Sequence, residues 1–243
     1  GFSRGAYAVR SLAGLIDQIG LLQAEHATER AVRQAYRHYE RAPDSPAAQA
    51  FAKAHCHPTT QIELVGIWDT VKALGLRLPV LWRWSAPNHA FHSHARGRQV
   101  KRGVHALAMH ETRRAYEPVL WACPTDWQGD IEQVWFKGSH GDVGGQINGK
   151  LASRPLSNIP LTWVLSEAEA SGLYLPEGWR QGYPCDATAP SVGAWRGWAR
   201  LFLARRRRGV GRDPSERVHA TALDPAPKLH VPDSGAAGPE VRA

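Results

Sequence analysis

Apolar positions recur with a helical period at the start of the chain. Over residues 3–22 they return every three or four residues, which predicts a helix with one buried face that stops near Gly20. A second helical pattern covers residues 24–40, and the prolines of residues 43–46 break it. The apolar face of the first helix consists of Val9, Leu12, Ala13, Ile16 and Ile19.

Two segments have the pattern of buried strands. Residues 61–68 alternate at first and then become nearly all apolar, which is typical of a strand in a parallel sheet. Asp69 follows directly at the end of this strand. Residues 132–136 predict another short strand, and the glycine-rich loop after it, residues 137–149, contains His140.

The rest of the chain divides into two more helical segments and two irregular ones. Helices are predicted around residues 104–114 and over residues 158–171. Residues 75–100 are rich in Trp, Pro and His without a steady period, which indicates an insertion or a lid. Residues 209–243 consist mainly of Pro, Gly, Ala and charged residues, and we expect most of them to be disordered.

The composition is that of a globular protein with an excess of positive charge. The chain has 243 residues, 43% of them apolar, so it can bury a core. It has no apolar run of the roughly 18 residues that span a bilayer. The net charge of +8 favours contact with anions, which include nucleic acids, acidic lipid surfaces and phosphorylated substrates. Because the chain begins with Gly1 rather than Met, we expect it to be a piece of a longer protein.

Neither the cysteines nor the histidines form a metal-binding pattern. The three cysteines are too far apart and odd in number for a disulfide framework or a zinc cluster, and we expect buried free thiols. Two loose histidine clusters lack the partners of a metal site, so we expect no metal and no cofactor. The residues concerned are Cys56, Cys123 and Cys185, and the clusters His55 with His57 and His89 with His92 and His94.

The first five residues match the pattern G-x-S-x-G. In serine hydrolases this pattern forms a tight turn from strand to helix, and glycines flank the serine because side chains there would collide. The pattern places Ser3 directly before the first predicted helix. A glycine-serine turn that caps a helix would produce the same residues, so the pattern needs further support.

That support comes from the order of the remaining candidates. Asp69 and His140 each follow a predicted strand, in the order serine, acid, histidine that α/β-hydrolases use. His140 would take the Ser3 proton as general base, and Asp69 would orient and stabilise the imidazole. The backbone N–H of Arg4 would face the developing oxyanion. Asp142 is an alternative acid, but it would have to fold back through a glycine-rich loop, and it fits better as a residue that shapes this loop.

A basic stretch with tryptophans precedes the C-terminal segment. From Trp195 to Arg208, aromatic and aliphatic residues stand beside a run of arginines, a pattern suited to lying on an anionic membrane surface. A packed helix with a solvated basic tip would give the same pattern. We expect no nucleic-acid binding, because no recognised motif accompanies the charge.

Three motifs together resemble one known family. In their order they are similar to the uncharacterised α/β-hydrolase domain family that includes the type VI secretion phospholipase effectors. The resemblance implies an α/β fold with a mostly parallel sheet and flanking helices, whose first strands lie upstream of Gly1. It also implies that Ser3, Asp69 and His140 correspond to the family's nucleophile, acid and base. The motifs are G-F-S-R-G-A-Y at 1–7, V-G-I-W-D-T-V at 65–71 and W-F-K-G-S-H-G-D-V-G-G at 135–145, with further likeness at 105–114 and 157–165.

The chain departs from the family pattern in three respects. His110 stands where relatives usually carry an acidic residue, and Gln146 stands where they tend to have a glycine. The third departure is that the family's N-terminal region is expected to lie upstream of Gly1. In the family this region is expected to supply the second oxyanion donor from a Gly-Thr-rich segment. We therefore expect residues 1–243 to be inactive by themselves.

The function expected from these residues is carboxylic ester hydrolysis through an acyl-enzyme on Ser3. The resemblance implies a lipid or phospholipid ester, and a secretion-system or immunity partner. A non-catalytic remnant or interaction module from a truncated gene is the alternative. We expect a catalytic domain in residues 1–175, a basic extension in residues 176–208 and the tail in residues 209–243. Charge and cysteine content fit a bacterial cytoplasmic protein as well as a secreted effector.

Overall fold

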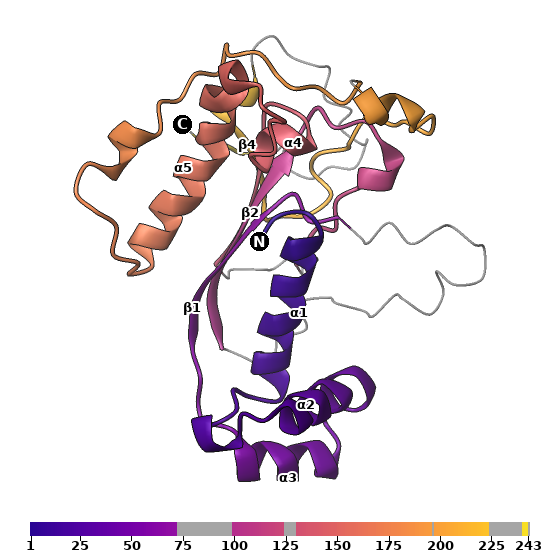
Figure 1. Ribbon diagram of the computed structural model, residues 1–243, viewed down its shortest axis with the longest axis vertical. Helices are drawn as coiled ribbons and strands as arrows, with labels where there is room; N and C mark the ends of the chain where they lie inside the picture. The colour runs from indigo at the N-terminus through magenta and orange to yellow at the C-terminus, as the bar shows by residue number, and fades with distance from the viewer. Residues whose placement is uncertain (72–98, 124–129, 196, 224–239, 243) are drawn as a thin grey trace. The chain divides into compact units, whose positions relative to one another are not determined.

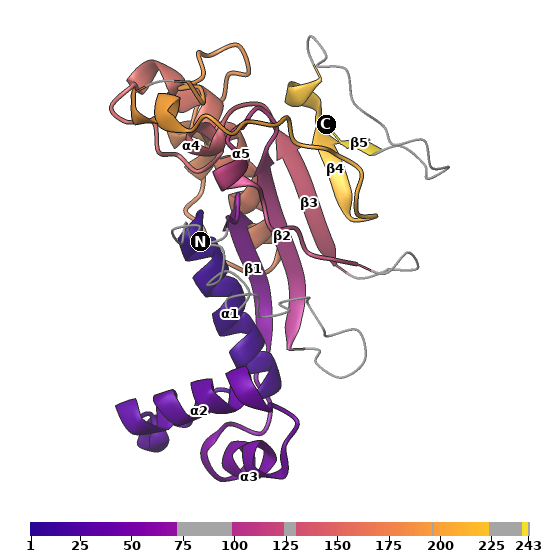
Figure 2. The ribbon, with the colours of Figure 1, turned by 90° about the vertical axis from the view of Figure 1, so that its right-hand side faces the viewer.

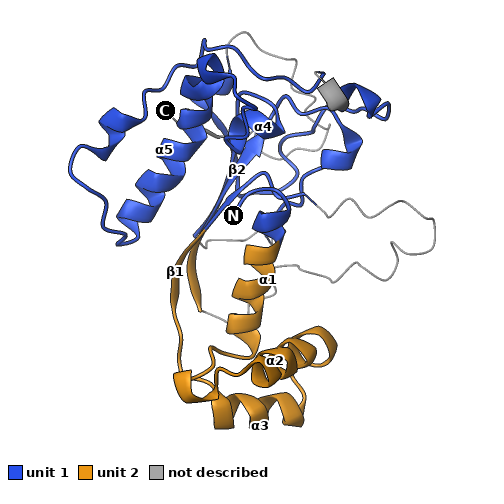
Figure 3. Cartoon of the chain, in the orientation of Figure 1, with its two compact units in different colours: residues 1–7, 66–74, 103–243 blue, residues 8–65, 75–102 orange. Residues whose placement is uncertain are grey.

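The chain folds into two compact units (Figure 3). The first comprises residues 1–7, 66–74 and 103–243, and the second comprises residues 8–65 and 75–102. The computed structural model describes residues 1–71, 99–123, 130–195, 197–223 and 240–242. The segment predicted as a lid therefore lies almost wholly outside the described residues. Within the described part, no helix has the length and apolar character needed to cross a bilayer.

A five-stranded sheet organises the fold, and its strands lie side by side in the order β1-β2-β3-β4-β5 (Figure 2). Parallel pairing joins β2 to β3, β3 to β4 and β4 to β5, with Leu107 opposite Trp135 in the middle of the sheet. A mostly parallel sheet with helices beside it confirms the predicted α/β class. The strands are β1 (Ile62–Trp68), β2 (Val100–Ala108), β3 (Ile131–Phe136), β4 (Glu216–His219) and β5 (Glu240–Arg242).

One long helix of the first unit, α5 (Arg154–Ala170), lies along a face of the sheet (Figure 1). The ring of Trp163 on this helix lies 5.3 Å from the ring of Phe136 on β3. The indole N–H of Trp68 donates to the Pro160 carbonyl at 3.3 Å and ties the helix to the end of β1. A core beside β2 and β3 consists of Leu107, Trp135, Val210, Val218 and Ala222.

Three helices supply most of the second unit. They are α1 (Arg4–Gln18), which begins in the first unit, α2 (Glu29–Arg41) and α3 (Pro46–His55). The hydroxyls of Thr28 and Ser45 cap α2 and α3, each accepting a backbone N–H at 3.2 Å. The core of this unit consists of Ile19, Ala35, Ala48, Phe51 and Cys56.

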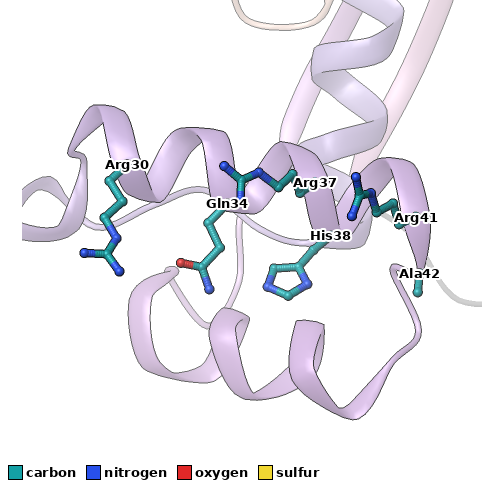
Figure 4. A pocket seen from close by; sticks show the side chains of 6 residues that line it. All are labelled: Arg30, Gln34, Arg37, His38, Arg41 and Ala42. Atoms are coloured by element: carbon teal, nitrogen blue, oxygen red, sulfur yellow. The ribbon is translucent and has the colours of Figure 1, made fainter.

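A hollow of about 470 Å³ lies along α2 and is lined by arginines (Figure 4). None of its arginines forms an ion pair within the described part of the chain. None of the predicted catalytic residues lines it, so this hollow is separate from the candidate site. Its lining consists of Arg30, Gln34, Arg37, His38, Arg41 and Ala42.

The helix predicted around residues 104–114 is wrong, because β2 occupies most of this segment. From Gly103 to Ala108 every residue is buried, since β2 lies between two neighbouring strands and is covered on both faces. A strand buried on both faces loses its alternation, and a short apolar run of this kind cannot be told from a helix by its period.

Three further segments differ from the predictions. The chain breaks between Arg41 and Pro46 as predicted, but a helix that was not predicted, α3, follows, and Pro46 occupies its first turn, a position that tolerates proline. His140 begins a short helix, α4 (His140–Val143), rather than lying in an open loop. β4 lies within the segment expected to be disordered, and Glu216 and Val218 of this strand are 1% exposed. Residues 224–239 of that segment lie outside the described residues.

Candidate active site

Ser3 sits in a tight turn at the edge of the sheet. Phe2 forms a parallel bridge with Trp68 at the end of β1, and the Ser3 N–H donates to the Trp68 carbonyl at 3.0 Å. The next residue, Arg4, begins α1. Ser3 has a φ of 57°, a left-handed backbone that few residues other than glycine adopt. This strand-to-helix turn is the geometry that the G-x-S-x-G pattern requires.

Asp69 and His140 follow two other strand ends. Asp69 follows β1 directly, is 0% exposed and has a φ of 40°. Its backbone N–H donates to the Ala106 carbonyl of β2 at 2.7 Å, and its Oδ1 accepts the Ala108 N–H at 3.0 Å. His140 begins α4, four residues beyond the end of β3 at Phe136. Parallel strands end at the same edge of a sheet, so the three side chains converge there.

The three side chains form one hydrogen-bonded chain. His140 Nε2 lies 2.9 Å from Ser3 Oγ, and His140 Nδ1 lies 2.5 Å from Asp69 Oδ2. The carboxylate is an acceptor, so Nδ1 carries the proton in this contact and Nε2 is left to accept the serine hydroxyl. A serine, a base and an orienting acid in this order are the arrangement used for acyl transfer.

Two aromatic rings hold the imidazole of His140 from the sides. The ring centroid of Phe2 lies 4.5 Å from that of His140, and the centroid of Tyr116 lies 4.8 Å from it. Phe2 also lies against Gly144, where a Cβ atom would stand 2.0 Å from the ring. Gly144 therefore has to be a glycine, because any side chain at this position would collide with the ring of Phe2.

Comparison with known proteins identifies the family. The family model for the type VI secretion system (T6SS) phospholipase effector Tle1-like catalytic domain matches residues 1–167. The chain belongs to this family. A comparison with curated proteins gave no match.

Two solved structures are similar to parts of the Tle1-like chain. One is the Tle1 effector bound to the VgrG spike from the type 6 secretion system, with 23% identity and a TM-score of 0.32 over 60% of this chain and 23% of that one. The other is an uncharacterized protein from Pseudomonas aeruginosa, with 19% identity and a TM-score of 0.42 over 79% of this chain and 28% of that one. The chain thus spans about a quarter of the length of these proteins.

The alternative acid, Asp142, makes its hydrogen bonds within the loop around α4. Its Oδ2 accepts the N–H and the hydroxyl of Ser139, both at 2.7 Å, and the hydroxyl of Ser191 at 2.5 Å. Its Oδ1 accepts the Val192 N–H at 2.8 Å. These bonds fit the loop-shaping role, whereas Asp69 is the carboxylate in contact with the imidazole of His140.

Glu111 also contacts His140, and the sequence analysis missed it. Its buried carboxylate accepts the His140 backbone N–H at 3.2 Å and pairs with Arg113, at 2.8 Å to Nε and 2.7 Å to Nη2. Burial would raise the pKa of Glu111, but the hydrogen bonds and charge of Arg113 lower it overall. Glu111 adjoins His110, one of the positions at which the sequence predicts a departure from the family pattern.

Arg208 is a second residue that the sequence analysis did not assign to the site. It comes from beyond the matched Tle1-like region, and its guanidinium binds both carboxylate oxygens of Asp69. Burial alone would raise the pKa of Asp69, yet the charge of Arg208 and the hydrogen bond to His140 hold this pKa well below its usual range. No local pattern marks this arginine, because it lies within a basic run that resembles a solvated surface.

The prediction of buried free thiols holds for one of the three cysteines. The three cysteines are free thiols, but only Cys56 is buried, while Cys123 is half-buried and Cys185 is exposed. Burial raises the pKa of the Cys123 thiol to about 12. Within the described ranges, no group of three or more His, Cys, Asp or Glu side chains could hold a metal ion. The cluster His89, His92 and His94 lies outside these ranges.

Proposed function

We propose that the protein hydrolyses carboxylic esters with Ser3 as nucleophile, His140 as general base and Asp69 as the orienting acid. The observation that carries this proposal is the pair of hydrogen bonds at His140, 2.9 Å to Ser3 Oγ and 2.5 Å to Asp69 Oδ2. Membership of a phospholipase effector family supports hydrolysis as the reaction class.

The reaction follows from the positions of these atoms. Ser3 Oγ attacks the ester carbonyl while its proton moves to His140 Nε2, and Asp69 stabilises the imidazolium that forms. The Arg4 N–H, at the start of α1, donates to the tetrahedral oxyanion and is aided by the positive end of the helix dipole. The alcohol leaves with the proton from His140, and water then hydrolyses the acyl-enzyme by the same route.

The substrate that the family supports best is a phospholipid, and an exposed surface near the C-terminus fits a membrane. Leu203 is 90% exposed, Leu201 is 68% exposed and Trp195 is 60% exposed. Arg206 and Arg207 beside them are exposed as well. We name these five residues the 195–207 surface, and infer that it contacts anionic lipid, since exposed apolar groups beside cations suit such a surface.

Two arginines of the predicted membrane segment do not belong to this surface. The guanidinium of Arg205 stacks on the Trp195 ring at 3.5 Å and donates to the carbonyls of Ala194 and Ala199. Arg208 is turned inward to Asp69.

By family membership we also propose delivery through a type VI secretion apparatus, with a spike component and an immunity protein as partners.

The test of the catalytic proposal compares the full-length protein with its Ser3→Ala variant on a soluble chromogenic ester and on phospholipid vesicles. We expect activity that Ser3→Ala lowers by about 10⁴-fold or more. A fluorophosphonate probe should label the parent protein at Ser3. A folded parent that is inert on both substrates and remains unlabelled would instead favour a non-catalytic interaction module.

The membrane contact has a separate test. The double variant Leu201→Ser and Leu203→Ser should lose binding to vesicles rich in anionic lipid and retain its rate on the soluble ester. Leu151→Ser is the matched control, because Leu151 is 76% exposed elsewhere on the chain. Equal vesicle binding by the double variant and the control would exclude this surface.

A further inference from the structure

Both terminal nitrogens of the Arg208 guanidinium are hydrogen-bonded at the candidate site. Nη1 donates to Asp69 Oδ1 at 2.5 Å and to the Ala108 carbonyl at 2.7 Å. Nη2 donates to Asp69 Oδ2 at 3.0 Å and to the Tyr116 carbonyl. The side chain of Arg208 is 5% exposed and that of Asp69 is 0% exposed. This is a buried bidentate pair whose cation is also held by two backbone carbonyls.

The hydrogen bonds of Asp69 fix the orientation of its carboxylate. Oδ1 accepts from Arg208 and from the Ala108 N–H, while Oδ2 accepts from Arg208 and from His140 Nδ1. Four donors occupy a group with about four lone-pair sites. Rotation of the carboxylate away from His140 would break several of these bonds at once.

The segment around Arg208 is anchored on both sides. Before it, Arg205 forms an antiparallel bridge with Arg113, and the Arg206 N–H donates to the Thr112 carbonyl at 2.7 Å. After it, the Glu216 carboxylate accepts the N–H groups of residues 211, 212 and 213 at 2.8 to 3.1 Å. Glu216 also accepts the indole N–H of Trp135 at 2.6 Å, so the position of Arg208 is tied to the middle of the sheet.

From this geometry we infer that Arg208 is a positioning residue of the triad, which fixes the Asp69 carboxylate toward His140 and supplies the charge that balances it. The inference rests on the proposed function of Ser3, His140 and Asp69. It assigns a role in the site to a segment beyond residue 167, where the Tle1-like match ends.

Two ion pairs lie around His140. Asp69 is paired with Arg208, and Glu111, which holds the His140 backbone, is paired with Arg113. Two further titratable neighbours in the described part of the chain are Tyr116, whose ring lies beside the imidazole, and Asp142 of α4, whose carboxylate accepts from serine hydroxyls and backbone N–H groups. Because Arg208 balances the charge of Asp69, its loss leaves an uncompensated negative charge on the Asp69–His140 pair.

The test uses the full-length protein and the pH profile of kcat/KM on a soluble ester. In Arg208→Met the Asp69 carboxylate loses the cation beside it, so we expect the acid limb of the profile to move to higher pH by about one unit or more. We expect the plateau kcat to fall by roughly tenfold, with KM changed less than twofold, because the carboxylate loses two of its four donors. Arg208→Lys keeps the charge but not the planar fork, so its acid limb stays near that of the parent while kcat falls a few-fold.

A double-mutant cycle separates this role from a general effect on folding. In an Asp69→Asn background, Arg208→Met should change kcat by less than about threefold, because Arg208 acts through Asp69. Arg180→Met, which removes an exposed arginine from its pair with Glu169, is the control and should leave the acid limb unchanged.

The outcomes are distinguishable. If the parent is active and folded Arg208→Met and Arg208→Lys keep its acid limb and kcat, this inference is overturned while the proposed function stands. Equal losses from Arg208→Met in both backgrounds overturn it as well. If the parent itself is inert and Ser3 is not labelled by a fluorophosphonate, the proposed function fails and the inference fails with it.

Discussion

The buried carboxylate of Glu111 accepts the backbone N–H of His140 at 3.2 Å. This hydrogen bond ties the first residue of α4 to the loop that follows β2. It thereby fixes the backbone position of His140, which carries the imidazole. The same carboxylate is held by Arg113, whose side chain is 12% exposed. The placement of the proposed general base thus depends on an ion pair outside the Ser3–His140–Asp69 chain.

Replacement of Glu111 tests this dependence. Glu111→Gln leaves Arg113 charged and largely buried without its carboxylate, and removal of one partner of a buried pair costs about 3–5 kcal/mol of unfolding free energy. We expect a loss of that order in urea unfolding, together with a fall in kcat. Glu169→Gln breaks an exposed pair with Arg180 and should leave the urea midpoint almost unchanged. Similar small losses in both variants would contradict a special role for Glu111.

Ser3→Gly should separate stability from activity. The φ of 57° at Ser3 costs free energy in any residue with a Cβ, by about 1 kcal/mol, and glycine removes this cost. Ser3→Gly and Ser3→Ala should both be inactive, with the glycine variant more stable by about 1 kcal/mol in urea unfolding. Identical unfolding midpoints for the two variants would show that the turn is not strained.

Gly144→Ala should disturb the ring beside His140. The new Cβ would stand 2.0 Å from the Phe2 ring, so the ring or the loop must move. Overpacking of this kind costs typically 1–3 kcal/mol, and we expect a lower kcat because Phe2 lies against the imidazole. Gly182→Ala is the control, because a Cβ at Gly182 meets nothing within 4 Å. Unfolding and kinetic measurements that do not distinguish the two variants would argue against this contact.

The stability of the fold should fall on acidification in two stages. Burial lowers the pKa values of His110 and His219, so the unfolded chain takes up protons first and stability declines as the pH falls below about 6.5. The pKa values of Asp69 and Glu111 are also lowered, so their contribution is present above about pH 4 and is lost below it.

Urea midpoints between pH 8 and pH 3 check this order. His219→Gln should reduce the decline between about pH 6.5 and 5 and leave the decline below about pH 4 in place. A midpoint that stays constant from pH 8 to pH 5 in the parent would contradict the prediction for the histidines.

Much of the candidate site was predictable because its residues carry local signals. The G-x-S-x-G pattern before a helical period identified Ser3, and a carboxylate and a histidine after strand-like runs identified Asp69 and His140. These signals reside in single segments, and parallel strands bring their ends together. Once the strands are paired in parallel, their ends place the three side chains close enough to form one hydrogen-bonded chain.

The residues that were missed depend on partners far along the chain. Arg208 stands 139 positions from Asp69, and within its own segment it looks like one more arginine of a basic run. β4 is short and carries two charged residues. The buried carboxylate of Glu216 is compensated by the N–H groups that donate to it from Trp135 and from the loop at residues 211–213. Charge in such places is explained by tertiary contacts, which no periodicity reveals.

The exposed arginines immediately before Arg208 make this segment accessible to proteolysis. Arg206 and Arg207 are exposed, and this run of basic residues is the sequence that a trypsin-like protease cleaves. A single cut after Arg206 or Arg207 would release Arg208 from the anchor that Arg205 and Arg206 provide, while Ser3, Asp69 and His140 remain in an otherwise intact fold. Limited proteolysis at this point would then lower the proposed activity irreversibly, by a cut more than 130 residues along the chain from Asp69.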